Sequence, residues 1–482
     1  MKKLLIAAPK SGSGKTILTC GLLEILKRKK IPTASFKCGP DYIDPLFHKR
    51  VIGVESRNLD SFFETPEGLK NVFFHGCQGK EKGLAFVEGV MGYFDGLAGI
   101  LPDASTYEIA NVLDIPAILV VDAKGASLSL AALIKGFSEY CPPVGNDGHR
   151  EGKRCIKGVI LNRVSPMIYP GLKKTLEAEL GILVAGYIPN LDFLHIESRH
   201  LGLVLPNEIE DLQQQMGKLA DVLEKSLDLE AILKIAGEGE KEEEAFRDPV
   251  QNIQDSSKAF RLGVARDEAF CFYYHENLRA MERAGAHLVE FSPLHQKELP
   301  KDLDGLLLGG GYPELYAGKL AENESMKASV YEASQKGMPI HGECGGYLYL
   351  LEYLENPEGI PYPMTGIFKG MGKKGTGLKN FGYITLTAKA DMAFFSKGSK
   401  IRGHEFHYWQ AVCIENGQEQ DNNYPCKTQM QAEKPAGKRS WQAMEQKGNT
   451  LAGFPHFYYP SCLEFTRNFA SACVRFHDRN VL

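Results

Sequence analysis

The chain has 482 residues, of which 43% are hydrophobic and 24% charged, and its 56 Lys and Arg residues against 60 Asp and Glu residues give a net charge of −4. This composition is typical of a globular protein with two or three domains, and it excludes a disordered or fibrous chain. The near balance of charge gives no basic surface for nucleic acid, and the apolar runs are too short for a membrane span or a secretory signal. We therefore expect a cytoplasmic protein without a nucleic-acid or membrane partner.

Short apolar runs alternate with helical patterns along the first half of the chain. The runs lie at residues 4–8, 85–88, 117–122, 158–161 and 184–188. A second series follows, with runs at residues 261–266, 287–291, 305–308 and 338–341. Apolar strands that alternate with helices are typical of parallel α/β sheets. We therefore predict an α/β fold with two domains, the first of which has a mostly parallel sheet.

A polar, Glu-rich segment at residues 237–258 separates the two series and lacks the apolar periodicity of a packed element. The predicted boundaries are 1–238 for the N-terminal domain, 239–258 for a linker and 259–482 for the C-terminal domain. Two further polar stretches, 141–154 and about 415–449, are predicted to be surface insertions, because added loop length costs little closure entropy.

The first predicted strand leads into Pro9-Lys-Ser-Gly-Ser-Gly-Lys-Thr16, and a helical pattern follows. This order is typical of a phosphate-binding P-loop, in which backbone amides and the helix N-terminus surround phosphate oxygens. We expect Lys15 to reach the β- and γ-phosphates and Thr16 to ligate Mg²⁺. The predicted ATP-binding residues are Lys10, Ser11, Gly12, Ser13, Gly14, Lys15 and Thr16. Pro9 replaces the usual first glycine, and the alternative is a Gly-rich turn with an exposed lysine.

Acidic residues follow two further predicted strands at the same edge of the sheet. Asp41 and Asp44 lie in Lys37-Cys-Gly-Pro-Asp-Tyr-Ile-Asp44, while Glu88 ends a strand and Asp95 lies in the Gly-rich loop after it. Ligands of open α/β sheets bind at this edge, and nucleotide chemistry needs carboxylates that hold Mg²⁺ and position a nucleophile. The alternative is that Asp41, Asp44 and Asp95 are turn residues beside proline or glycine.

The second domain places a cysteine between glycines at the end of a predicted strand. Gly342-Glu-Cys-Gly-Gly346 precedes an apolar helical run, which resembles a nucleophile elbow whose helix N-terminus lowers the thiol pKa. We predict Cys344 as a catalytic nucleophile and His456 as its base. The amides of Gly310 and Gly311 are predicted to form an oxyanion hole. The alternatives are a core cysteine and a tight turn at a strand exit.

Two histidines, His404 and His407, are three positions apart and could suggest a metal site, but no Cys or further His nearby completes a ligand set. We interpret them as contacts to substrate or between domains. A P-loop domain joined to a domain with an activated cysteine predicts ATP-dependent amidation. The cysteine would release ammonia from glutamine through a thioester, and ATP would activate a carboxylate as an acyl phosphate. The two sites should then face one another.

Eight segments of the sequence resemble the cobyrinate a,c-diamide synthase family, in family order. They are Pro9–Thr16, Lys37–His48, Ser56–Asp60, Val87–Gly96, Arg199–Leu203, Leu308–Glu314, Glu343–Gly346 and Arg402–His407. The resemblance implies a dethiobiotin-synthetase-like ATP domain and a class I glutamine amidotransferase domain. In that second domain the catalytic pair is cysteine and histidine, without the third acidic residue of the usual triad. The family's closing motif, Ser-Tyr-x-His-x-His, reads Gly453-Phe-Pro-His-Phe-Tyr458 here, so a tyrosine replaces the second histidine.

The resemblance also implies site residues and partners. The implied metal ligands are Thr16, Asp41 and Glu88, and the implied tetrapyrrole contacts are Asp41, Tyr42, Ile43, Asp44 and Asp95. The implied reaction is amidation of the a and c acetate carboxylates of cobyrinate in cobalamin biosynthesis, through acyl phosphates, with ATP, Mg²⁺ and ammonia from L-glutamine. Alternative acceptors are nickel-sirohydrochlorin and hydrogenobyrinate. Cobyric acid synthase fits the Lys37 motif less well, and a further alternative is a nonenzymatic P-loop ATP switch. The expected assembly is a homodimer, although the sequence itself leaves the oligomeric state open.

Overall fold

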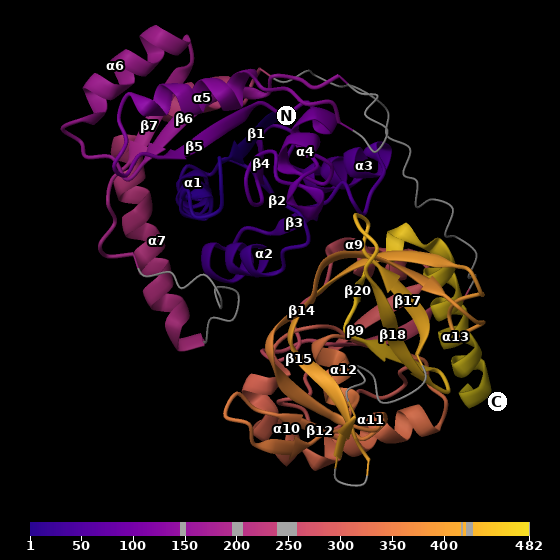
Figure 1. Cartoon of the computed structure of the whole chain (residues 1–482). Helices are drawn as coiled ribbons and strands as arrows, with labels where there is room; N and C mark the ends of the chain where they lie inside the picture. The colour runs from indigo at the N-terminus through magenta and orange to yellow at the C-terminus, as the bar shows by residue number, and fades with distance from the viewer. Residues whose placement is uncertain (145–150, 195–205, 239–257, 416–417, 421–427, 482) are drawn as a thin grey trace. The chain divides into compact units, whose positions relative to one another are not determined.

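The computed structural model describes residues 1–144, 151–194, 206–238, 258–415, 418–420 and 428–481. The chain divides into two compact units, Met1–Arg247 and Asp248–Leu482 (Figure 1). The predicted linker, for residues 239–257, and the segment Arg199–Leu203 lie outside the described residues. Among the described helices, none combines the length and apolarity that a membrane crossing requires.

The N-terminal unit is built on a seven-stranded sheet in the order β3-β2-β4-β1-β5-β6-β7, and all its strand pairs are parallel. Its strands are β1 (Lys2–Ala7), β2 (Thr33–Cys38), β3 (Ser56–Leu59), β4 (Leu84–Glu88), β5 (Ala117–Asp122), β6 (Ile156–Asn162) and β7 (Leu183–Ile188). Continuous apolar runs such as residues 4–7 form these strands because both faces of a parallel sheet are covered.

Helices cover both faces of this sheet (Figure 1). On one face lie α3 (Pro66–Cys77), α4 (Thr106–Leu113), α5 (Ser129–Glu139) and α6 (Tyr169–Leu180). On the other lie α1 (Lys15–Arg28), α2 (Ile43–Phe47), the π-helix His48–Ile52, α7 (Pro206–Ser226) and α8 (Leu229–Ile235). A short 3₁₀ turn, Leu97–Gly99, follows β4. Because β1 lies between β4 and β5, the loop after β1 opens at the middle of the carboxyl edge, where open α/β sheets bind ligands.

The C-terminal unit has a parallel core in the order β19-β11-β10-β8-β9. These strands are β8 (Phe260–Ala265), β9 (Ala286–Phe291), β10 (Gly305–Leu308), β11 (Ile340–Glu343) and β19 (Thr450–Gly453). The helices are α9 (His275–Arg283), α10 (Ala317–Glu322), α11 (Glu324–Gln335), α12 (Gly345–Leu350) and α13 (Leu463–Val481), with 3₁₀ turns at Pro313–Tyr316 and Tyr459–Ser461. The predicted α/β fold with a mostly parallel N-terminal sheet is therefore confirmed.

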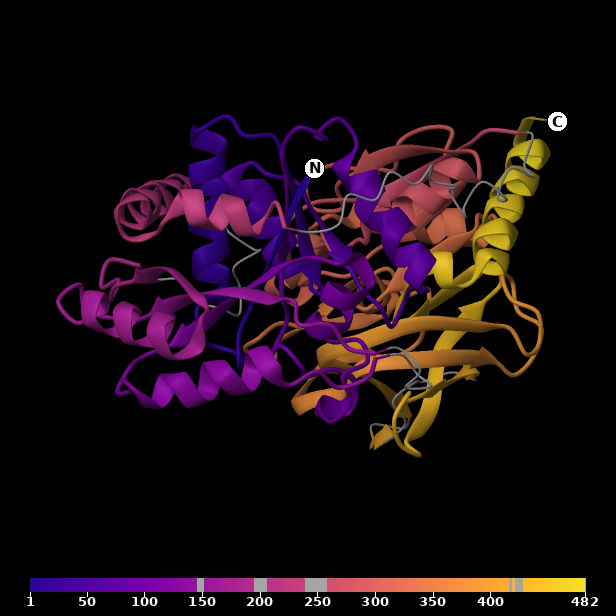
Figure 2. The ribbon, with the colours of Figure 1, turned by 90° about the horizontal axis from the view of Figure 1, so that it is seen from above.

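Mostly antiparallel strands extend the second sheet beyond its parallel core, with β12 parallel to β14, and the long orange pair in Figure 2 is β14 with β15. The added strands are β12 (Tyr353–Glu355), β13 (Pro361–Pro363), β14 (Met371–Ala388), β15 (Lys400–Glu415), β16 (Gln418–Gln420), β17 (Thr428–Glu433), β18 (Ser440–Lys447) and β20 (His456–Phe457). Strands β17 and β18 fall inside the stretch predicted as a surface insertion, and that prediction is wrong for them. Met430 and Ala432 are fully buried because they lie on one face of β17, where apolar residues alternate with polar ones, and Ala443 and Met444 are fully buried in the middle of β18.

Candidate functional site

The P-loop joins β1 to α1 and depends on glycine at two positions. Gly12 and Gly14 have φ angles of 77° and 102°, in the left-handed region that favours glycine. A Cβ on Gly14 would lie 2.3 Å from Nδ2 of Asn162. Gly14 is also the N-cap of α1 and has no side chain to cap it, so the first amides of this helix face the loop as donors for an anion.

The predicted side chains of the P-loop converge on the end of β4. Lys15 is buried, and its Nζ donates to the carbonyl of Met91 in the loop after β4. Burial, with the neighbouring charge of Lys37, lowers the pKa of Lys15 to about 8. The Thr16 hydroxyl donates to Oε1 of Glu88 at 2.7 Å. Lys10 and Ser11 are exposed, while Ser13 is buried and closes the loop.

A buried lysine gathers the acidic residues into one cluster. Nζ of Lys37 lies 2.5 Å from Oδ2 of Asp44 and 2.9 Å from Oε1 of Glu88, and Oδ2 of Asp41 is 3.9 Å away. Burial opposes the charge on Lys37, but the three carboxylates raise its pKa well above the usual value. The sequence motif alone did not indicate a role for Lys37, because Glu88 reaches it only through the pairing of β2 with β4.

Glu88 is the most enclosed acid of this cluster. It is fully buried, and burial raises the pKa of its carboxyl to about 7 against the charge of Lys37. Nε2 of His48 lies 3.6 Å from its Oε2, and burial lowers the pKa of His48 to about 4, so that imidazole is neutral at pH 7. A carboxyl group whose pKa is near neutral can give up its proton when a cation arrives.

The other predicted acids hold local turns. Oδ1 of Asp41 accepts hydrogen bonds from the amides of Ile43 and Asp44, the first two residues of α2, at 2.8 and 3.1 Å. Oδ2 of Asp95 accepts from the amide of Gly92 at 3.1 Å in the loop after β4. Tyr42 is buried and Ile43 is half-buried. Asp41 and Asp95 therefore have the turn roles given above as the alternative. Their loops lie at the same edge of the sheet as the P-loop.

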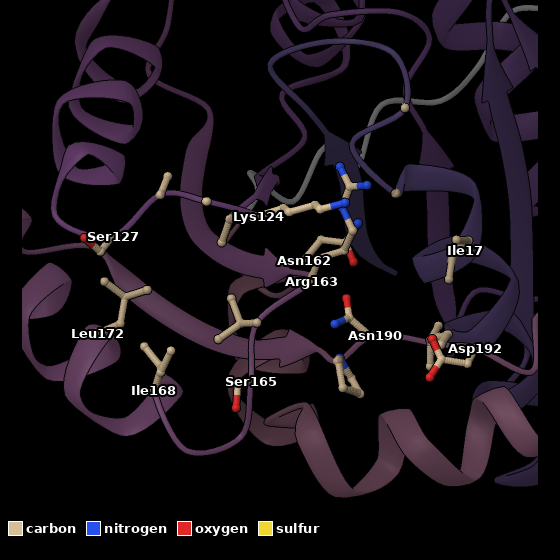
Figure 3. A pocket seen from close by; sticks show the side chains of 18 of the residues that line it. Ile17, Lys124, Ser127, Asn162, Arg163, Ser165, Ile168, Leu172, Asn190 and Asp192 are labelled. Atoms are coloured by element: carbon tan, nitrogen blue, oxygen red, sulfur yellow. The ribbon is translucent and has the colours of Figure 1, made fainter.

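A cleft of about 830 Å³ opens beside the P-loop. Gly12, Gly14 and Ile17 line it together with residues 162–165 at the end of β6 and 189–192 after β7. Figure 3 shows Asn162, Asn190 and Asp192 around this hollow. Nδ2 of Asn162 donates to the carbonyl of Ser13 at 2.9 Å, so β6 supports the P-loop directly. Sequence reasoning missed these residues, although both segments follow predicted strands at the same edge.

The second predicted site is the turn from β11 to α12. Cys344 has a φ of 49° and a ψ of −102°, a strained conformation for a residue with a side chain. Its amide donates to the carbonyl of Gly453 at 2.7 Å. A Cβ on Gly346 would lie 2.0 Å from the carbonyl oxygen of Leu308, and a Cβ on Gly345 would lie 3.0 Å from the amide nitrogen of Gly311. The glycines after the cysteine therefore allow close approach of β10 and its loop.

The expectation of a lowered thiol pKa is wrong in this structure. Burial raises the pKa of the Cys344 thiol, and the charge of Glu314 adds to the rise. The amide of Gly345 acts in the predicted direction, but its effect is smaller. A thiol with a raised pKa is neutral at pH 7, so it needs a base that removes its proton as it attacks.

His456 lies on β20 and is buried. Its ring stacks on the ring of His404, with centroids 4.8 Å apart, and Nδ1 of His404 forms a 3.0 Å hydrogen bond with the Tyr274 hydroxyl. A Cβ on Gly310 would lie 2.4 Å from Cε1 of His456. Burial, followed by the charge of His404, lowers the pKa of His456 to about 3, so its imidazole is neutral at pH 7 and able to accept a proton.

The Gly310–Gly311 loop contacts both predicted partners. Gly310 packs against His456, and the amide of Gly311 lies beside Gly345, the residue after the cysteine. The carbonyl of Gly310 accepts hydrogen bonds from the amides of Cys271 and Phe272 at 2.9 and 3.0 Å, which fixes the loop. The structure thus brings the cysteine turn, the histidine and the glycine loop together, as an acyl-transfer site requires.

His407 makes its own contacts beside this group. Its ring stacks on Phe454, and its Nε2 lies 3.2 Å from Oε2 of the buried Glu405. Within the described ranges, no group of three His, Cys, Asp or Glu side chains is arranged to hold a metal ion.

Comparison with known proteins gives matches to both units. A CobQ/CobB/MinD/ParA nucleotide-binding domain matches residues 4–204, and a CobB/CobQ-like glutamine amidotransferase domain matches residues 261–461. A cobyrinate a,c-diamide synthase of Listeria monocytogenes is 38% identical over 475 residues, which cover 98% of this chain and 99% of that protein. Proteins of the same name from Caldanaerobacter subterraneus and Clostridium tetani are 36% and 37% identical, over 98% and 97% of this chain and 98% and 99% of their own lengths. The likeness therefore includes both units in the same order.

Proposed function

The chain belongs to the cobyrinate a,c-diamide synthase family and is a glutamine-hydrolysing, amidating enzyme with a nucleotide-binding domain, and we propose that it amidates the a and c acetate carboxylates of cobyrinate with ATP and L-glutamine. The observation that carries the proposal is the presence, on one chain, of a P-loop with an acidic cluster and a cysteine turn with a neutral histidine. One site activates a carboxylate, and the other releases ammonia.

In the N-terminal unit, the proposed phosphate contacts are the P-loop amides, Lys15 and Thr16, with Lys10, Ser11 and Ser13 beside them. The cleft lined by Asn162 and residues 189–192 provides room for the nucleoside. The acceptor carboxylate attacks the γ-phosphorus of ATP and gives an acyl phosphate and ADP, and ammonia then displaces phosphate to form the amide. Asp41, Tyr42, Ile43, Asp44 and Asp95 remain the proposed tetrapyrrole contacts, because their loops lie at the P-loop edge of the sheet.

The side chains at the end of β4 suit Mg²⁺. Mg²⁺ prefers oxygen ligands and is held by one or two carboxylates together with phosphates and water. The Thr16 hydroxyl and the Glu88 carboxylate meet at 2.7 Å, and Oε2 of Glu88 is buried and accepts no hydrogen bond from the described residues. Asp41 fits less well, because one of its oxygens already accepts two amides. When bound, Mg²⁺ would neutralise phosphate charge during phosphoryl transfer.

In the C-terminal unit, His456 takes the proton from the Cys344 thiol while Sγ attacks the side-chain carbonyl carbon of glutamine. The amides of Gly310 and Gly311 hold the resulting oxyanion. The C–N bond then breaks, the leaving nitrogen takes the proton from His456 as ammonia, and a thioester remains. Water hydrolyses the thioester to glutamate and restores the thiol.

The test is product formation by the purified full-length chain with cobyrinate, ATP, Mg²⁺ and either glutamine or ammonia. Mass spectrometry should show the diamide with both nitrogen sources. Cys344→Ser should form product only with ammonia, whereas Cys462→Ser, at another buried cysteine of the same unit, should use both sources. Loss of both activities in folded Cys344→Ser would contradict the division of labour.

The same assay separates the alternatives. Product from nickel-sirohydrochlorin or hydrogenobyrinate alone would change the acceptor, and absence of glutamine hydrolysis with every acceptor would favour the P-loop switch. We also propose a homodimer, which sedimentation velocity would test.

A further inference from the structure

A buried carboxylate lies directly beside the proposed catalytic base. Glu343 is the last residue of β11, immediately before Cys344, and only 4% of it is exposed. Its Oε2 lies 3.9 Å from Nδ1 of His456. Sequence reasoning quoted Glu343 within a motif without giving it a role, because the acid and the histidine are far apart along the chain.

The other oxygen of Glu343 is held by groups that fix the carboxylate in place. Oε1 accepts a hydrogen bond from the amide of Phe457 at 3.2 Å, and Nε2 of His341 lies 3.0 Å from it. Nδ1 of His341 is in turn 3.2 Å from the carbonyl oxygen of Leu451. His341 is fully buried, so this chain of contacts excludes water from the far side of the carboxylate. Because these contacts hold Oε1, the other oxygen, Oε2, faces His456.

This placement assigns different tasks to the two nitrogens of the His456 ring. Nδ1 faces the carboxylate, which leaves Nε2 as the nitrogen that exchanges a proton with the thiol. The other charged neighbours that act on this ring are two histidines, His404, which is stacked on it, and His407. When His456 takes the thiol proton, Glu343 is the negative charge beside the new imidazolium, in a site where burial weakens screening.

We propose that Glu343 positions His456 and stabilises its imidazolium during glutamine hydrolysis, in place of the third acidic residue that the Cys–His pair lacks. The proposal rests on the function proposed for Cys344 and His456. Glu343 does not contact glutamine, and it acts through the histidine, as the aspartate does in a Ser-His-Asp triad. The proton moves only between Cys344, His456 and the leaving ammonia.

The test variant is Glu343→Gln in the full chain, because the amide keeps the size of the side chain and an oxygen for the Phe457 amide but removes the charge. The glutamine-dependent kcat should fall by at least about tenfold, with little change in KM for glutamine and none in the ammonia-dependent rate. The acidic limb of kcat/KM for glutamine should move to lower pH, because the carboxylate that favours protonated His456 is gone. Glu343→Asp restores the charge and should recover part of kcat and the pH of this limb.

Asp304 offers a matched control in the same unit. Like Glu343, it is 4% exposed, and it accepts a backbone amide, from Arg261 at 2.7 Å, and faces Nδ1 of His477 at 2.9 Å. It immediately precedes β10, whereas the cysteine turn follows the end of the neighbouring strand β11. Asp304→Asn should lower thermal stability and leave the pH profile for glutamine unchanged.

Four outcomes would overturn the proposal. Glu343→Gln could keep the wild-type kcat and pH profile, or Asp304→Asn could show the same shift of the acidic limb. Glu343→Asp could fail to recover kcat, or the wild-type enzyme could fail to hydrolyse glutamine. The last outcome would also refute the proposed function, and the first three would leave it standing. If Glu343→Gln loses the ammonia-dependent rate as well and is therefore misfolded, Glu343→Asp decides alone, and loss of glutamine hydrolysis in that variant with an intact ammonia-dependent rate contradicts the proposal.

Discussion

Removal of the buried ammonium of Lys37 should strongly destabilise the N-terminal unit. It lies 2.5 Å from Asp44 and 2.9 Å from the fully buried Glu88, and its side chain is 5% exposed. Lys37→Met keeps most of the volume but leaves both carboxylates without their common counter-charge. Removing one partner of a buried ion pair is costly because the remaining charge has neither water nor a partner.

The size of the effect follows from the geometry. At an effective dielectric constant of about 20, two unit charges at the Lys37–Glu88 distance attract by about 6 kcal/mol, and desolvation offsets part of this energy. Breaking such a pair typically costs about 3–5 kcal/mol. Since 1 kcal/mol shifts Tm by about 2–4 °C in a unit of this size, we expect a decrease in Tm on the order of 10 °C.

The two tryptophans of the chain make the assay specific. Trp409 and Trp441 both lie in the C-terminal unit, so tryptophan fluorescence reports on that unit alone, whereas far-ultraviolet circular dichroism reports on both. Lys37→Met should lower a transition seen by circular dichroism and leave the fluorescence transition in place. The matched control is Lys153→Met, because Lys153 pairs with Asp114 at 2.7 Å but is 53% exposed, and loss of such a surface pair costs at most about 1 kcal/mol.

The pH dependence of the stability loss in Lys37→Met tests this explanation. Burial raises the pKa of Glu88 to about 7, and loss of Lys37 would raise it further, so acid protonates the carboxyl that Lys37 had neutralised. The cost of Lys37→Met should therefore be smaller near pH 5.5 than near pH 8, and Lys37→Met/Glu88→Gln should cost less than Lys37→Met alone. The explanation would be refuted if Lys37→Met left Tm unchanged or lowered it only as much as Lys153→Met does. A larger loss of stability at acidic pH than at pH 8 would refute it as well.

Three further variants test other contacts. Asn162→Ala removes the hydrogen bond to the carbonyl of Ser13, worth about 1 kcal/mol, and should raise KM for ATP about fivefold in steady-state kinetics; an unchanged KM would contradict the support role. Gly310→Ala would place a Cβ 2.4 Å from Cε1 of His456 and should reduce the glutamine-dependent rate at least about 100-fold while sparing the ammonia-dependent rate. Burial raises the pKa of Glu314 from its usual 4.5 to about 8, so stability falls as pH rises through this interval. In denaturant titrations, the free energy of unfolding of Glu314→Gln should equal that of wild type near pH 5 and exceed it near pH 8 by roughly a few kcal/mol. The same difference in free energy at both pH values would count against this prediction.

Local patterns made the fold and the positions of both turns predictable. Each apolar run named from the sequence corresponds to a strand, because strands buried on both faces need continuous apolar residues. The strand–loop–helix order around Gly14 and the strand–turn–helix order around Cys344 are likewise local. Strands β17 and β18 were missed because their apolar residues are few and lie within a polar stretch of the sequence.

The wrong prediction for the Cys344 thiol has a different cause. A helix N-terminus can be identified from sequence, but the burial of the sulfur depends on packing by elements distant in sequence, including the Gly309–Gly311 loop and β19. Burial and the charge of Glu314 together outweigh the amide of Gly345. The direction of a pKa shift is therefore a property of the assembled site and cannot be obtained from the motif alone.

The residues that sequence reasoning found differ physically from those it missed. Gly14, Gly310 and Gly346 are glycines because a Cβ would collide with atoms 2.0–2.4 Å away. A position of close approach can therefore be identified from the glycine in the sequence. Nothing in the local sequence indicates the roles of Lys37 and Glu343, because these roles arise only when the folded sheet brings Glu88 and His456 to them from 51 and 113 residues away. A carboxylate before a cysteine or a lysine before a turn is compatible with many structures. The groups that tune both sites are therefore those that only the three-dimensional structure can identify.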